Sequence, residues 1–138
     1  MIRIIIWLKP YAKYLLAFWL ITIITFSSIP SLPTLKIHTD RADIRLDYLI
    51  HFCEYGLLAF ITFLAFASSE LKISHERYFY ITLFLLAFAV LDEFHQKFIP
   101  GRTFNPKDIL GNILGIVAAL GFCILVFGNI ARRLRDHN

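Results

Sequence analysis

Carboxylates and imidazoles lie close together at two places in the 138-residue chain, at spacings that bring them toward one side of a helix. The candidate catalytic residues are Asp92, Glu93, His95 and Gln96 in one stretch, and His51 and Glu54 in the other. In an acid/base arrangement, His95 carries the proton and Asp92 or Glu93 orients the imidazole. Asp92 with His95, and His51 with Glu54, could instead coordinate a divalent metal. Facing helices of a bundle build metal sites from carboxylate and imidazole pairs of this kind. We favour the metal-free arrangement, assign no metal ligands and leave the cofactor open, because spacing does not show that four ligands converge.

A second group of polar residues could bind a substrate. These candidates are Arg102, Asp47, Asp108, Asn112 and Ser28. Arg102 follows Gly101, which permits a sharp turn, and a guanidinium is suited to two-point binding of phosphate or carboxylate.

The same residues also have structural interpretations. Asp47, Asp108 and Ser28 could be helix boundaries or caps, and Arg102 could be a side chain that snorkels to a membrane interface. His51 and Glu54 could form a hydrogen-bonded pair that locks two helices together. The 92–96 stretch could be a solvated helix end.

The segments that must position these residues are strongly apolar. The chain is 58% hydrophobic and only 17% charged, and its mean hydropathy is +0.66. A bilayer core about 30 Å thick needs roughly 20 apolar residues in a helix. Four stretches of about this length run over 11–29, 48–67, 78–99 and 109–130. The sequence therefore predicts an all-α integral membrane protein, a single domain over 1–138, formed by a bundle of four transmembrane helices in two hairpins.

Because consecutive spans alternate in direction, the unusual polar residues of all four spans reach the same level of the membrane. The opposite side, with both termini, holds eight of the fourteen Lys and Arg residues: Arg3, Lys9, Lys13, Lys72, Arg77, Arg132, Arg133 and Arg135. The positive-inside rule therefore predicts cytoplasmic termini and a polar pocket at the extracytoplasmic face. The net charge of +4 requires no nucleic-acid partner, since basic termini also anchor to anionic lipid.

At these residues the sequence resembles the VanZ-like family. The family's Asp-Glu-x-His-Gln signature is present at 92–96, and its Pro-Gly-Arg turn at 100–102. Its helix start Asp-x-x-x-Asn-x-x-Gly is present at 108–115, and the elements at 27–30 and 47–52 also fit. Tyr48 stands where many members have Lys, so an anion held by that Lys in relatives would need another group here.

The resemblance implies a multi-pass protein of the bacterial cytoplasmic (inner) membrane with a role in the cell envelope. It also implies a link to glycopeptide resistance of the teicoplanin type. It does not define a reaction or an oligomeric state.

Three functional hypotheses follow. The first is a membrane hydrolase or transferase that uses the Asp-Glu-x-His-Gln motif on a membrane lipid or a lipid-linked cell-wall precursor. The second is a non-catalytic binding protein for the same class of molecule. The third is a transporter or proton relay, which requires polar residues along the whole path and ranks last, because the other half of the spans offers chiefly Thr62 and Thr82.

Overall fold

The computed structural model describes residues 2–30, 36–39, 42–102 and 104–136. Its helices are α1 (Ile2–Leu8), η1 (Lys9–Tyr11, a 3₁₀ turn), α2 (Ala12–Ser27), α3 (Asp47–Phe66), α4 (His75–Gln96) and α5 (Pro106–Asp136). A short antiparallel hairpin, β1 (Lys36–Thr39) and β2 (Ala42–Arg45), precedes α3. Among the described residues, four segments are long and apolar enough to cross a membrane: Arg3–Ser27, Asp47–Phe66, His75–Gln96 and Pro106–Arg133. The prediction of a helical membrane protein with four spans is confirmed.

The observed bounds differ from the predicted ones where local chemistry starts or stops a helix. α4 begins three residues earlier than predicted because the Ser74 hydroxyl accepts a hydrogen bond from the Arg77 amide (3.3 Å) and caps the helix. It ends at Gln96, before a turn in which Gly101 has φ +76°. α5 continues to Asp136, beyond the predicted end at residue 130. The hairpin of β1 and β2 was not predicted.

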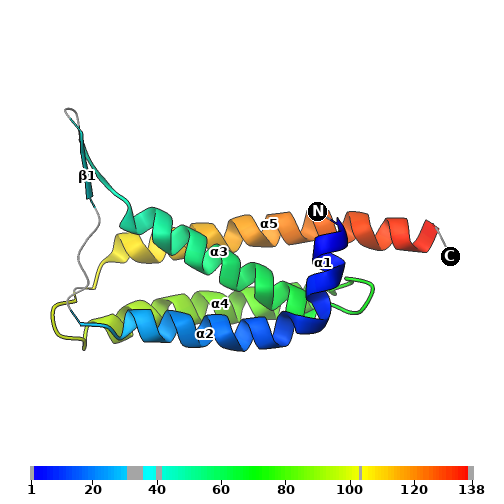
Figure 1. Cartoon of the computed structure of the whole chain (residues 1–138), viewed down its shortest axis with the longest axis horizontal. Coiled ribbons are helices and arrows are strands. Elements are labelled where there is room, and N and C mark those ends of the chain that lie inside the picture. The colour runs from blue at the N-terminus through cyan, green and yellow to red at the C-terminus, as the bar shows by residue number, and fades with distance from the viewer. Residues whose placement is uncertain (1, 31–35, 40–41, 103, 137–138) are drawn as a thin grey trace.

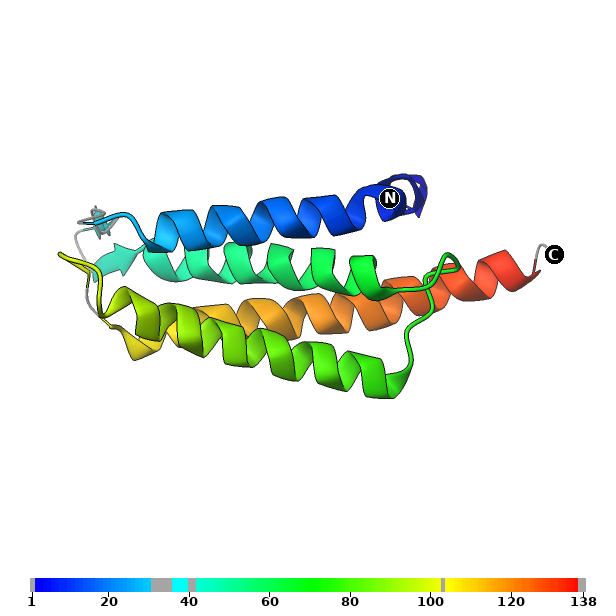
Figure 2. The same ribbon diagram turned by 90° about the horizontal axis from the view of Figure 1, so that it is seen from below.

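The chain forms two helical hairpins, α2 with α3 and α4 with α5, and both termini lie at the same end of the bundle (Figure 1, Figure 2). α2 and α4 run away from that end, while α3 and α5 run back toward it. We call the other end, where α2 and α4 finish and α3 and α5 begin, the polar end. α1 turns away from α2 at η1, which contains Pro10.

The parallel helices α3 and α5 touch backbone to backbone. A Cβ added at Gly115 would lie 2.2 Å from the Phe52 carbonyl oxygen and 2.8 Å from the Gly56 nitrogen. One at Gly111 would lie 3.0 Å from the Tyr48 carbonyl oxygen. Small residues four apart allow this approach, as they do between membrane helices generally. The contact fixes how far α5 can slide along α3.

Apolar side chains fill the bundle and also cover its outside. Tyr55, Phe63 and Phe127 are almost completely buried between the helices. Phe84 and Leu125, by contrast, are more than 60% exposed on the outer faces. A soluble protein rarely exposes continuous apolar surface of this kind, whereas lipid tails cover it without cost. The packing therefore agrees with a membrane environment.

Candidate functional site

Polar side chains from three helices are buried together at the polar end. They are Asp92, Glu93 and Gln96 of α4, Asp108 and Asn112 of α5, and the partly or fully buried His51 and Tyr55 of α3. Glu93 and Asn112 have no exposed surface at all. The group lies near the first turns of α3 and α5 and the last turns of α4. Chain direction therefore brings residues more than fifty positions apart to one level.

One face of α4 points inward and carries Asp92, Glu93 and Gln96, in line with the buried Leu85 and Ala89. Each residue advances a helix by about 100°, which places position 95 about 100° from the middle of that face. The His95 side chain is exposed. The structure thus separates His95 from the carboxylates with which the sequence analysis grouped it.

The imidazole that reaches the buried group belongs to His51. Its Nδ1 lies 3.0 Å from Oδ1 of Asn112, and its Nε2 lies 3.8 Å from Oδ2 of Asp108. An amide oxygen only accepts hydrogen bonds, so with the Asn112 amide in this orientation Nδ1 carries the hydrogen. The Nδ2 of Asn112 is buried and has no partner among the described residues. In the neutral ring, Nε2 then presents a lone pair toward the Asp108 side.

Asn105, which sequence reasoning missed, connects two carboxylates. Its backbone N–H donates to Oε1 of Glu93 (2.8 Å), and its side-chain Nδ2 donates to Oδ1 of Asp108 (2.9 Å). Its own Oδ1 accepts from the Lys107 amide (3.1 Å), as an N-cap does at a helix start. The signal was available, because Asn followed by Pro106 is typical of a helix N-terminus.

Tyr55 was also missed. Its hydroxyl donates to Oδ2 of Asp92 at 2.9 Å, and both residues are buried. Tyr55 follows His51 by four residues, as His51 follows Asp47, so the three share a side of α3. The repeat of polar residues every four positions was therefore a sequence signal that could have identified Tyr55 as part of the buried group.

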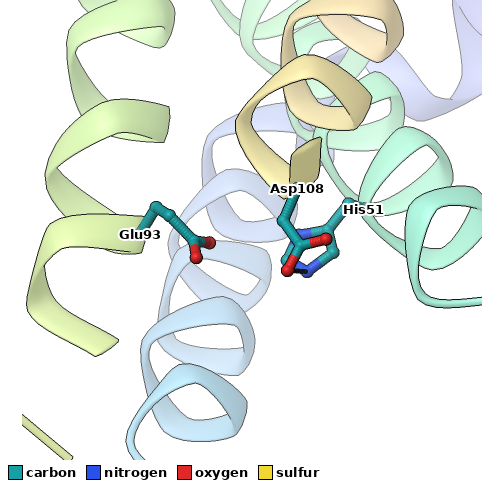
Figure 3. A group of neighbouring side chains, drawn as sticks. All are labelled: His51, Glu93 and Asp108. Carbon is teal, nitrogen blue, oxygen red and sulfur yellow. Dashed lines mark ion pairs between the residues drawn. The ribbon is translucent and has the colours of Figure 1, made fainter. Parts of the chain in front are cut away.

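Three of these side chains converge on one small region. His51, Glu93 and Asp108 each offer one nitrogen or oxygen ligand atom, and these atoms all lie within 4.8 Å of one another. Figure 3 shows the side chains reaching toward one another from three separate helices. Oε2 of Glu93 is buried and has no hydrogen-bond partner among the described residues. An imidazole between two buried carboxylates can exchange protons or hold a cation.

Comparison with known proteins places the chain in a family. The model of the VanZ/LLP1 family matches residues 6–127, which is most of the chain. The protein belongs to the VanZ/LLP1 family. No curated protein and no solved structure matches it.

The remaining predicted residues of this VanZ/LLP1 protein lie around the buried group. Arg102 is half-buried. Its Nη2 donates to the Phe26 carbonyl at 3.5 Å, while its buried Nε has no partner in the described part of the chain. Glu54, also half-buried, is within electrostatic range of both His51 and Arg102. Arg102 thus contacts the end of α2 and keeps a buried donor available.

Two residues take local roles. The Ser28 hydroxyl donates to the Ile24 carbonyl of its own helix at 2.7 Å, which agrees with the helix-end interpretation. Asp47 lies in the first turn of α3, half-buried, where its charge favours the helix N-terminus.

An open cavity of about 380 Å³ lies at the other end of the bundle, lined by Phe66, Ser74, Glu76, Arg77, Tyr80 and Ile81. Phe66 ends α3, Ser74 is the N-cap of α4, and the others lie in the first turns of α4. The cavity is therefore separate from the buried group of the VanZ/LLP1 protein. The pocket predicted at the polar end is not confirmed.

Proposed function

We propose that this VanZ/LLP1 protein is an enzyme that acts on the polar part of a membrane lipid or a lipid-linked cell-envelope component. We orient its polar end to the extracytoplasmic side of the bacterial inner membrane, with both termini in the cytoplasm. The observation that carries the proposal is the convergence of His51, Glu93 and Asp108 from three helices. Ionisable side chains inside spans are costly to bury, so a group of them indicates function.

The reactive centre in this proposal is His51, Glu93 and Asp108, in place of the His95 arrangement expected from the sequence. Asn112 holds the His51 ring through Nδ1, and Nε2 lies on the Asp108 side. A held imidazole beside carboxylates is the arrangement that general acid/base catalysis uses. His95, exposed on α4, does not meet that requirement.

The class of substrate follows from the surroundings of the centre. Phe94 in the last turn of α4 and Phe98 just after the helix are both exposed, and their ring centroids lie 5.5 Å apart. They offer an apolar surface to acyl or prenyl chains at the depth of the buried group. Nε of Arg102 is a donor suited to an anionic group such as phosphate. A lipid with an anionic headgroup would fit both the apolar surface and the Arg102 donor.

The second candidate, a binding protein without catalysis, is favoured by one observation. Arg102 has a buried donor available whether or not His51 exchanges a proton. Such a protein would hold the headgroup and change how surface ligands of the envelope engage it. The relay hypothesis gains no support. The Thr62 hydroxyl donates to the Leu58 carbonyl of its own helix (2.7 Å), and the buried Thr82 hydroxyl has no partner among the described residues, so the two do not form a continuous polar path.

A matched pair of histidine variants tests the enzyme. The wild type, His51→Gln and His95→Gln are expressed in a bacterial host beside an empty vector. Membrane lipids and lipid-linked wall precursors are then profiled by mass spectrometry. We expect the wild type and His95→Gln to change the profile equally. His51→Gln should lose turnover by about 10²-fold to 10⁴-fold, as removal of an acid/base group does.

The outcomes separate the candidates. A wild-type profile in His51→Gln would remove the catalytic assignment. If the wild type and His51→Gln changed teicoplanin susceptibility alike and Arg102→Lys did not, the binding function would be supported, because Lys keeps the charge but not the planar fork. Teicoplanin susceptibility of the same strains tests the further proposal that this activity alters glycopeptide action. Equal susceptibility of wild type and vector would end that proposal.

A further inference from the structure

We infer that His51, Glu93 and Asp108 form a binding site for a divalent transition-metal ion. The inference rests on the proposed function for the place of the reactive centre and deepens it by naming what the centre holds. The three ligand atoms lie within 4.8 Å of one another and come from three different helices. They can therefore approach one ion from three sides (Figure 3).

The distance between two of the atoms fits a shared ion. His51 Nε2 and Asp108 Oδ2 lie 3.8 Å apart, which is too long for a direct hydrogen bond. Two ligands of a tetrahedral Zn²⁺ with bonds of about 2.0–2.1 Å lie roughly 3.3 Å from each other. A closure of about half an ångström would bring these two atoms to that separation, and the Glu93 oxygen, which lies within 4.8 Å of both, would also move closer.

Glu93 supplies a second, independent observation. It is completely buried, and its Oε2 has no hydrogen-bond partner among the described residues. Its Oε1 accepts from the neutral Asn105 amide. A buried carboxylate held only by a neutral donor is costly to ionise, and a bound cation removes that cost. The orphaned oxygen therefore points to a positively charged ligand.

The residues behind the three ligands are arranged as in other metal sites. Asn112 holds Nδ1 of His51, which fixes the ring and leaves Nε2 for an ion. Asn105 holds one oxygen of Glu93 and one of Asp108. Outer partners of this kind orient metal ligands and tune their basicity.

The ligand types select the kind of ion. An imidazole nitrogen favours Zn²⁺ and its neighbours in the transition series over Mg²⁺, whereas two carboxylates also suit Mn²⁺. Zn²⁺ binds a given site more tightly than Mn²⁺, so Zn²⁺ is the probe that tests the whole class. Three protein ligands leave a coordination position for an oxygen of a headgroup or water. With an ion bound, His51 is a metal ligand in place of the acid/base role proposed above, and the cation would polarise that oxygen.

The full-length protein, purified in detergent and stripped with chelator, is dialysed against Zn²⁺, and its metal content is measured by mass spectrometry. We expect about one Zn²⁺ per chain, as for a site with a single set of ligands. His51→Gln, Glu93→Gln and Asp108→Asn should each lose this ion, while His95→Gln should keep it. Co²⁺ in place of Zn²⁺ should give visible absorption in the wild type that Glu93→Gln lacks.

Two results would overturn the site: a wild type that binds no Zn²⁺ above the detergent blank, or equal binding by wild type and the three ligand variants. The wild-type measurement stands even if a variant fails to fold. Zn²⁺ binding with an unchanged lipid profile in His51→Gln would reject the proposed function and keep the metal site. No Zn²⁺ binding with a lost lipid effect in His51→Gln would reject the metal site and keep the proposed function.

Discussion

At the scale of residues, the polar end depends on side chains that each serve two neighbours. Asn105 caps α5 through its side-chain oxygen and also holds both Glu93 and Asp108. Asn112 orients His51. A change at either asparagine is therefore expected to act on the proposed reactive centre without altering His51, Glu93 or Asp108 themselves.

Removing the Tyr55 hydroxyl should destabilise the bundle. Tyr55→Phe leaves the buried Asp92 oxygen without its 2.9 Å donor, and an unsatisfied buried group costs about 1–3 kcal/mol. The control is Tyr14→Phe, since Tyr14 is 78% exposed. Unfolding by SDS titration in mixed micelles measures both. Equal free energies of unfolding for the two variants would show that the Tyr55 contact does not matter.

The choice of histidine for the proposed site marks a limit of prediction at this scale. His51 and His95 both stand beside carboxylates in the sequence. Because one residue turns a helix by about 100°, small uncertainty in the orientation of α4 moves His95 from the bundle to its surface. Only the packing of α4 on its neighbours decides between them.

At the scale of elements, the register of α3 and α5 positions the site. The glycine contact at Gly111 and Gly115 lies within one turn of Asn112, and Phe52 on the opposite helix follows His51 directly. A slide by one helical turn would move Asn112 about 5.4 Å from His51. The close glycine contact between α3 and α5 therefore sets the distance between His51 and Asn112.

Two glycines of α5 should respond oppositely to alanine. In Gly115→Ala the new Cβ would meet backbone at 2.2 Å and push the helices apart, which costs about 1–3 kcal/mol or more. Gly121→Ala meets nothing within 4 Å and gains helix propensity. The same SDS titration compares them. A Gly115→Ala protein as stable as Gly121→Ala would contradict the close contact.

At the scale of the whole molecule, the number and approximate positions of the spans could be predicted because lipid allows few alternatives to a helix. The common level of Asp92 and Asp108 followed from alternating chain direction. The hairpin before α3 carries no comparable signal, because its residues at 36–45 mix charge and apolar character. Tertiary contacts such as those of Asn105 depend on how helices meet, which hydropathy does not contain.

The orientation across the membrane can be measured with single cysteines at Lys97 and Ser74, in a chain that lacks Cys53 and Cys123. Both positions are exposed, and they lie at opposite ends of α4. We expect an impermeant maleimide added to intact cells to label Lys97→Cys and not Ser74→Cys. The reverse labelling would place the polar end in the cytoplasm and exclude an extracytoplasmic substrate.

The division of the buried group among three helices also bears on how the protein is made. His51 and Tyr55 enter the membrane with α3, Asp92 and Glu93 with α4, and Asp108 and Asn112 only with α5. Synthesis proceeds from the N-terminus, so the carboxylates of α4 meet their α5 neighbours last. A chain halted before α5 would hold polar side chains with incomplete partners. Insertion of α5 therefore completes both the set of four spans and the buried polar group in one step.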